Sequence, residues 1–181
     1  MVIYVTADDE TSGVARKLED ISFKDERVAI GAKFFRCVKI SASDAAEDRI
    51  LKVNGKSTPR LIFMKRNHQV VRVLEGRKLS ASKINKAMAK LCSAEFKNRY
   101  GSMLSGYAKL LNELDRLDDV RTKLAADAKR IADSKKKKNV SKRKKYDKAK
   151  ADFDKKMKAW NASETKLLEL KLKQQKRQAA A

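Results

Sequence analysis

The side chains most capable of chemistry in this chain are two cysteines and one histidine. Cys37 and Cys92 lie 55 positions apart (92 − 37 = 55), and His68 is the only histidine. A structural zinc site takes about four nitrogen or sulfur ligands in close spacing, and this set does not supply them. We interpret the cysteines as buried thiols, with a disulfide between them as the alternative. The sequence predicts no metal site, no cofactor and no catalytic residue.

A run of lysines in the second half is the other chemically distinctive feature. Of the eleven residues from 135 to 145, eight are basic and none is acidic. Like charges at this density disfavour a helix and predict an exposed turn. A cation placed on a phosphate releases a counterion, so the run is a candidate polyanion contact, with a solvated turn as the alternative. The candidate residues are Lys135, Lys136, Lys137, Lys138, Lys142, Arg143, Lys144 and Lys145.

The whole chain is basic, with a formal net charge of +22. Residues 1–92 carry 19 Lys/Arg and 11 Asp/Glu (19 − 11 = +8), and residues 93–181 carry 26 and 12 (26 − 12 = +14). This balance predicts affinity for nucleic acid, an anionic membrane surface or an acidic protein. No apolar run is long enough to span a bilayer. A strand pattern begins almost at Met1, with no signal peptide pattern before it. This favours a cytoplasmic location, and an extracytoplasmic location after signal removal stays open.

Residues 1–92 alternate between strand and helix patterns. We predict helices over 11–22, from Ser41 to a stop at Asn54-Gly55, and from Ser80 onward. Val14, Leu18 and Ile21 are expected to face inward from the first helix, and Ile84, Met88 and Leu91 from the last. The predicted strands are 2–6, 34–40, 60–64 and 69–74, the last two forming a hairpin.

Pro59 is the only proline, and it opens the predicted strand over 60–64. A cis peptide bond is cheap only before proline, so we predict that the Thr58–Pro59 bond is cis. The order of elements, with Thr58-Pro59 at this strand entry, resembles the thioredoxin fold over residues 1–92. The resemblance implies a mixed central sheet flanked by helices, in an α/β domain covering 1–92.

The resemblance also implies where a redox pair would lie. Glu10-Thr11-Ser12-Gly13 occupies the place of the Cys-x-x-Cys pair that catalytic members carry, so the chain is similar to a redox-inactive member. In the family, the residue before the cis proline contacts extended peptides. This implies a peptide-binding groove around Thr58, Pro59, Asp9 and Glu10. The alternative is that Pro59 only shapes the strand entry.

Residues 93–181 predict an all-α region. Apolar residues from Met103 to Ile131 recur in steps of four and three, with Arg121 interrupting. A second seam runs from Tyr146 to Leu170 through Phe153 and Trp160, with Lys156 and Ser163 as polar members and Met157 beside it. Two seams of similar length predict an antiparallel coiled-coil hairpin with its tip near 135–145. One long helix that dimerises is the alternative, and the C-terminus is expected to fray.

These patterns favour a non-enzymatic interaction or scaffold protein, in which a thioredoxin-like platform carries a basic coiled coil. Its expected partners are a protein, bound through either region, nucleic acid or another polyanion, and a second copy of the chain, bound through the coiled coil. The alternatives are a nucleic-acid-binding subunit of a ribonucleoprotein and a chaperone-like coiled coil. A thiol-disulfide oxidoreductase ranks last, because neither cysteine follows the first strand.

Overall fold

The computed structural model describes residues 1–8, 13–133 and 140–172, and the chain divides into two compact units. The first unit comprises Met1–Leu104 together with Leu170–Ala181, and the second comprises Ser105–Glu169. Each is described separately below. None of the helices in the described ranges is both long enough and apolar enough to cross a membrane.

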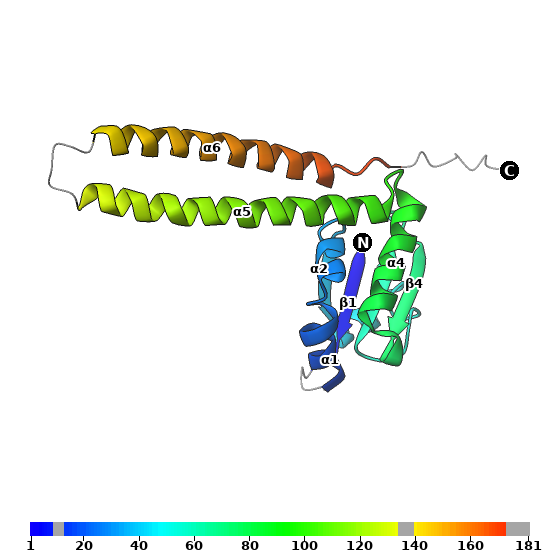
Figure 1. The fold of residues 1–181 in the computed structure, drawn as a ribbon. Helices are drawn as coiled ribbons and strands as arrows, with labels where there is room; N and C mark the ends of the chain where they lie inside the picture. Colours follow the sequence, from blue (N-terminus) through cyan, green and yellow to red (C-terminus); the bar gives the residue numbers. More distant parts are fainter. Residues whose placement is uncertain (9–12, 134–139, 173–181) are drawn as a thin grey trace. The chain divides into compact units, whose positions relative to one another are not determined.

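The first unit is an α/β fold in which strands and helices alternate (Figure 1). The strands are β1 (Val2–Thr6), β2 (Cys37–Ser41), β3 (Arg60–Met64) and β4 (Val70–Glu75). The helices before β3 are α1 (Gly13–Lys17), the π-helical η1 (Leu18–Ser22), α2 (Glu26–Ala32) and α3 (Ala42–Glu47). The 3₁₀ turn η2 (Gly76–Lys78), α4 (Ala81–Glu95) and the start of α5 (Tyr100–Ala132) follow β4.

The four strands form one mixed sheet in the order β2-β1-β3-β4. Strands β1 and β2 are parallel, whereas β1 with β3 and β3 with β4 are antiparallel. A bulge between Phe63 and Met64 shifts the register of the β3–β4 hairpin. The predicted mixed sheet with flanking helices is confirmed, and so is the cis bond between Thr58 and Pro59.

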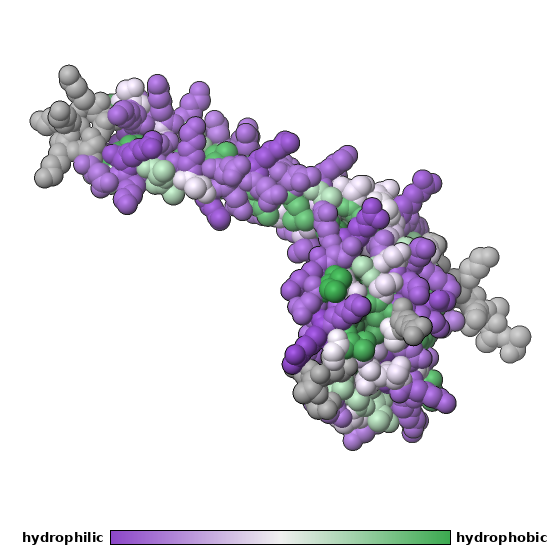
Figure 2. Space-filling model, turned by 60° about the horizontal axis from the view of Figure 1, so that its bottom comes forward, coloured by the Kyte–Doolittle hydropathy of each residue, from purple (hydrophilic) through white to green (hydrophobic). Residues whose placement is uncertain are grey.

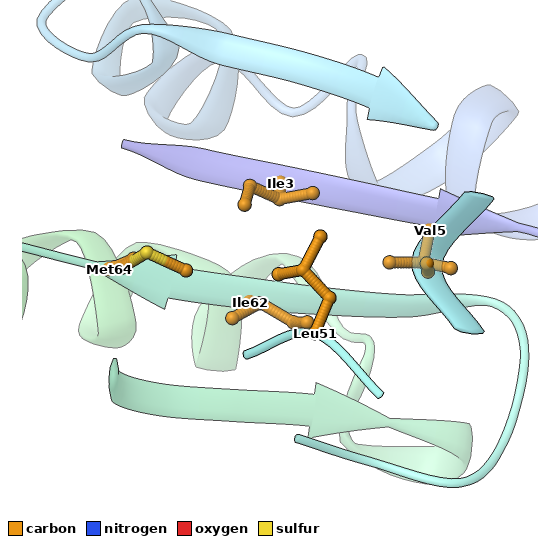
Figure 3. Close-up of a cluster of buried hydrophobic side chains, with 6 residues drawn as sticks. Ile3, Val5, Leu51, Ile62 and Met64 are labelled. Atoms are coloured by element: carbon orange, nitrogen blue, oxygen red, sulfur yellow. The ribbon is translucent and has the colours of Figure 1, made fainter. Parts of the chain in front are cut away.

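Both faces of the sheet are buried, which explains the continuous apolar runs in β1 and β3. Alternate side chains point to opposite faces. One face carries Ile3, Val5, Ile62 and Met64, which pack with Ala45 and Leu51 (Figure 3). The opposite face lies against α4, which contacts β3, β4 and α2 (Figure 1). Helix α4 buries Ile84, Met88 and Leu91 as predicted.

One predicted strand boundary and one predicted helix boundary in this unit are wrong. Helix α2 continues to Ala32, so the strand expected from residue 34 begins at Cys37. Ser41 caps α3 as predicted, and its hydroxyl accepts a hydrogen bond from the Asp44 amide. The helix ends at Glu47, however, because the Asp48 carboxylate accepts from the amides of Ile50 and Leu51 and starts a separate turn.

The second unit holds the rest of α5 and nearly all of α6 (Val140–Leu168). The Tyr107 hydroxyl donates to the Glu164 carboxylate, and the Trp160 indole N–H donates to the Leu110 carbonyl at 2.7 Å. A Cβ added at Gly106 would lie 3.2 Å from Leu167. The partners run in opposite order along the two helices, so α5 and α6 are antiparallel (Figure 1).

The apolar seam of α5 lies close to its predicted positions, because Tyr107, Leu117 and Leu124 are buried. The α6 seam was placed one residue early over part of its length. Lys156 and Ser163 are exposed, whereas Met157 and Glu164 are half-buried. The face of α6 that packs is made of buried Trp160 and five half-buried residues: Tyr146, Phe153, Met157, Glu164 and Leu167.

Gly31 is the tightest glycine position in the first unit. A Cβ there would collide with the Tyr100 hydroxyl and would lie 2.8 Å from the Met88 sulfur. We expect Gly31→Ala to lower the free energy of unfolding by ~1–3 kcal/mol, because overpacking a filled core displaces neighbours. Gly101→Ala is the control, since nothing lies within 4 Å of its added Cβ. Urea unfolding that gives the two variants equal midpoints would contradict this packing.

Leu117 tests the seam of the second unit, because its side chain is 4% exposed. We expect Leu117→Asp to destabilise this unit by about 3 kcal/mol or more, since it removes apolar contacts and buries an unpaired charge. Val120 is 40% exposed on the same helix, so Val120→Asp is expected to change stability by no more than ~0.5 kcal/mol. Thermal unfolding followed by circular dichroism measures both. A small effect at Leu117 would show that the seam is not packed.

Candidate functional site

The implied peptide groove is only partly described by the structure. Pro59 is fully buried and Thr58 is half-buried, while Asp9 and Glu10 lie outside the described residues. The chain before Thr58 is fixed by the Glu75 carboxylate, which accepts hydrogen bonds from Lys56 and Ser57. The Ser57 and Lys56 hydrogen bonds, with a smaller contribution from the charge of Arg60, lower the pKa of Glu75.

Arg60 is the buried charge of this region, and sequence reasoning gave it no role. Its guanidinium donates to the carbonyls of Ser57 and Leu51 at 3.3 and 3.4 Å. It also lies directly across the β3–β4 ladder from Glu75. Arg60 and Glu75 together hold the loop that leads into the cis bond, so we assign them a positioning role without chemistry of their own.

A separate apolar hollow of about 620 Å³ lies between α1–η1 and the segment 76–81. Its lining includes Val14 and Ile21, which are 49% and 62% exposed. The expectation that these two face inward is therefore wrong, and of the three only Leu18 is buried. Neither Thr58 nor Pro59 lines this hollow. Among the described residues that line it, Lys17 is the only ionisable one, so this part of the hollow suits apolar side chains.

The two cysteines are free and lie in unrelated surroundings, so no disulfide joins them. Cys37 is exposed at the start of the edge strand β2, so the prediction that both cysteines are buried is wrong for this residue. Its sulfur lies 3.6 Å from the carbonyls of Ala32 and Phe35. Partial burial of the sulfur raises the pKa of the Cys37 thiol, and the N-terminal amine opposes the shift. Cys92 is buried in α4 beside the Met103 sulfur. Neither residue lies at a helix N-terminus, where a thiol becomes nucleophilic.

Metal ligands do not gather anywhere in the described part of the chain, where no three His, Cys, Asp or Glu residues are placed to hold an ion. His68 lies in the β3–β4 turn with a positive φ of 63°. Asp8 accepts hydrogen bonds from the amide and hydroxyl of Ser43.

The predicted lysine run falls into two parts. Lys135, Lys136, Lys137 and Lys138 lie outside the described residues. Lys142, Arg143, Lys144 and Lys145 belong to α6, which begins at Val140, so the expectation of a turn through residue 145 is wrong. Lysine and arginine are good helix formers when their charged ends are solvated, and all four are exposed.

The start of α6 is electrostatically unfavourable without an anion. The positive end of a helix dipole favours acidic side chains, but the first turn of α6 contains none. Four cations follow within the next turn, from Lys142 to Lys145. Asp147, four residues after Arg143, is the first acid along the helix. An external anion would therefore be stabilised here by both the side chains and the helix end.

The remaining basic residues of α6 form a longer array that sequence reasoning missed. Helix α6 contains ten Lys/Arg and four Asp/Glu (10 − 4 = +6), whereas α5 contains six and five (6 − 5 = +1). All ten cations are exposed. Among the residues that the structure describes, the ion pairs of α5 and α6 join Arg121 to Asp118 and Arg130 to Asp127, and none involves a cation of α6.

Five of these lysines share one side of the helix, which we call the α6 stripe. Their steps are four, seven, three and eight residues, close to whole turns of 3.6. The stripe lies on the side of α6 opposite Phe153, Trp160 and Leu167, because it is about half a turn out of phase with them. The stripe lysines are Lys144, Lys148, Lys155, Lys158 and Lys166, with Ala151 and Ala162 between them.

The signal in the sequence that identifies the stripe is the spacing of the α6 lysines at nearly whole turns of 3.6 residues. Figure 2 shows that hydrophilic residues cover most of the visible surface of the α5–α6 pair, with only short apolar patches. Comparison of the chain with protein-family models, with curated proteins and with solved structures found no match in any of the three.

The thiol surroundings give a direct test of redox chemistry. We expect the protein to leave the rate of insulin reduction by dithiothreitol at the buffer value. At pH 7, we expect iodoacetamide to modify Cys37 more slowly than free cysteine, because a raised pKa lowers the thiolate fraction. Cys92 should react only after unfolding, and Cys37→Ser is the control that assigns the label. Catalysed reduction that Cys37→Ser abolishes would overturn this assignment.

Proposed function

We propose that this protein is a non-enzymatic nucleic-acid-binding protein in which the exposed cations of α6 contact the phosphate backbone. In this proposal the α/β unit is a redox-inactive thioredoxin-like domain that serves as a binding platform. The helices α5 and α6 form an antiparallel coiled-coil hairpin. The observation that carries the proposal is the α6 stripe, five exposed lysines that share one side of the helix.

Several features support the thioredoxin-like part of the proposal. A parallel β1–β2 pair is followed by the antiparallel β3–β4 hairpin and then by α4. The cis bond lies at the entry to β3, where the resemblance requires it. The cysteines lie in β2 and α4, away from the segment that would hold a redox pair. The apolar hollow beside α1 and η1 supports a platform role, because it exposes Val14 and Ile21.

The length of the stripe suits a regular array of phosphates. From Lys144 to Lys166 the helix rises ~33 Å, at 1.5 Å per residue. The phosphates of duplex DNA advance by about 3.4 Å along each strand, so lysines several residues apart can each reach a separate phosphate. Such contacts position a protein on nucleic acid without reading bases. We therefore propose binding with little sequence preference.

A protein or membrane partner fits the stripe less well. The centres of protein interfaces are enriched in aromatic residues and depleted in lysine, whereas the stripe contains only lysine and alanine. A helix that binds a membrane surface presents an apolar face to lipid. In α6 that face contains Trp160 and Leu167, which lie against α5. Nucleic acid can be bound through its phosphates by lysines alone, without an apolar contact surface.

Two variants of equal charge test the proposal. The stripe variant replaces the five stripe lysines by glutamine. The flank variant replaces the other five cations of α6 by glutamine: Lys142, Arg143, Lys145, Lys150 and Lys156. We expect the stripe variant to make the slope of log K against log salt shallower by about 4 for duplex DNA, because each lost phosphate contact removes about 0.9.

The flank variant separates position from net charge. We expect it to change the slope by less than the stripe variant does, although both lose five positive charges. If the flank variant changed the salt slope more than the stripe variant did, the phosphate contacts would lie at the start of α6, as the sequence first indicated. If both variants bound duplex DNA as tightly as the parent at ~0.1 M salt, the proposed function would be wrong.

A further inference from the structure

A second group of cations surrounds a hollow on the α/β unit, between β4 and α4. The hollow has a volume of about 160 Å³. Arg72 lies on its β4 side, and Lys83, Lys86 and Lys90 lie on its α4 side. Leu74 and Ala87 complete the lining, and both are buried. We call these four cations and two apolar residues the β4–α4 groove.

Packing of the fold places these cations at the surface. Ile84, Ala87, Met88 and Leu91 bury one side of α4 in the unit. Lys83, Lys86 and Lys90 are exposed, and their steps of three and four keep them along one side of the helix. On the sheet, β4 is an edge strand, and Arg72 is exposed while Leu74 is buried. The positions of the four cations are thus fixed by α4 and β4, each of which buries apolar side chains in the unit.

The acids of these two elements do not neutralise the groove. Strand β4 and helix α4 contain two carboxylates, Glu75 and Glu95. Glu75 accepts hydrogen bonds from Lys56 and Ser57, and Glu95 accepts from the Arg66 amide. Neither lines the groove. Within the described residues, no ion pair joins a groove cation to an acid.

We propose that the β4–α4 groove is a second nucleic-acid contact, in which the four cations bind consecutive phosphates of one strand. Lys83 and Lys90 are separated by ~10 Å of helix rise, which spans about three phosphates of a duplex strand. Arg72 contributes a planar donor group that matches phosphate oxygens in pairs. Buried Leu74 and Ala87 lie between the cations of β4 and α4, and all four cations line the same hollow.

The groove differs from the apolar hollow beside α1 and from the α6 stripe. Its exposed rim is cationic, and its apolar atoms belong to residues whose side chains are already buried. That arrangement gives a partner protein no apolar anchor. Two modest phosphate contacts on one chain would act on the same polymer, so the second would raise the overall affinity by effective concentration. The inference rests on the proposed function for the identity of the polyanion.

The test uses full-length chains and a short duplex DNA. The groove variant replaces Arg72, Lys83, Lys86 and Lys90 by glutamine. The control variant replaces one arginine and three lysines that are exposed elsewhere on the same unit: Arg16, Lys52, Lys56 and Lys97. We expect the salt slope of the groove variant to be shallower than that of the control by about 3.6, at about 0.9 for each of four phosphate contacts. Equal slopes and affinities for the two variants would overturn the inference.

Combination with the stripe variant separates this inference from the proposed function. If the stripe variant loses binding and the groove variant matches its control, the groove proposal fails and the α6 proposal stands. If the groove variant alone loses binding, the α6 proposal fails and the groove proposal stands. Lysine acetylation of the unmodified protein gives a second readout. We expect duplex DNA to protect Lys83, Lys86 and Lys90 more than Lys52 and Lys56, and equal protection would count against the groove.

Discussion

The functional account depends on the apolar contact between α5 and α6. Helix α6 has ten cations and four acids, and mutual repulsion would disfavour it as an isolated helix. Trp160 and the Tyr107–Glu164 hydrogen bond fix it against a nearly neutral partner helix. Burial and the Glu164 interaction raise the pKa of Tyr107 to about 12, so its hydroxyl stays protonated at neutral pH. The seam thereby keeps a row of lysines in a regular array.

In the α/β unit, too, apolar packing fixes the structure and the cations lie outside the core. The sheet buries both faces, and this apolar core fixes the outer surfaces of β4 and α4 without help from the exposed cations. The cations of the β4–α4 groove are therefore free to serve a ligand, since their replacement removes no core contact. The loop before Pro59 is held by a different device, the Arg60 and Glu75 hydrogen bonds, which leave the cis proline buried.

Local sequence signals predicted an element well where its hydrophobic period and its boundary residues indicated the same helix or strand. Strand β3 follows the only proline, and α4 has a serine at its N-cap position and a regular apolar face, so both were placed well, although Ser80 makes no side-chain capping hydrogen bond. Ile21 was misjudged because a regular α-helix was assumed. The π-helical turn from Leu18 to Ser22 has a different period and rotates Ile21 into solvent. Asp48 ended α3 by a side-chain hydrogen bond that the later Asn54-Gly55 signal obscured.

The candidate site was harder to predict than the fold. The seam of α6 contains Glu164, a residue type that hydrophobic periodicity ignores, and its partner Tyr107 is 57 positions away. The β4–α4 groove joins a strand residue to helix residues through tertiary packing, which no local pattern reports. The lysine run was visible as composition, but the start of α6 at Val140, inside that run, was not. The density of charge in the sequence pointed to the region near residue 140, and the helical structure of α6 was needed to identify the stripe.

The most direct measurement is the affinity of the unmodified protein for duplex DNA over a range of salt concentrations, with two unrelated sequences. The account predicts a straight line of log K against log salt. Its slope should be −4 or steeper, from about 0.9 for each of the stripe contacts, and the same for both sequences. A slope shallower than about −1, or no binding at ~0.05 M salt, would contradict the account.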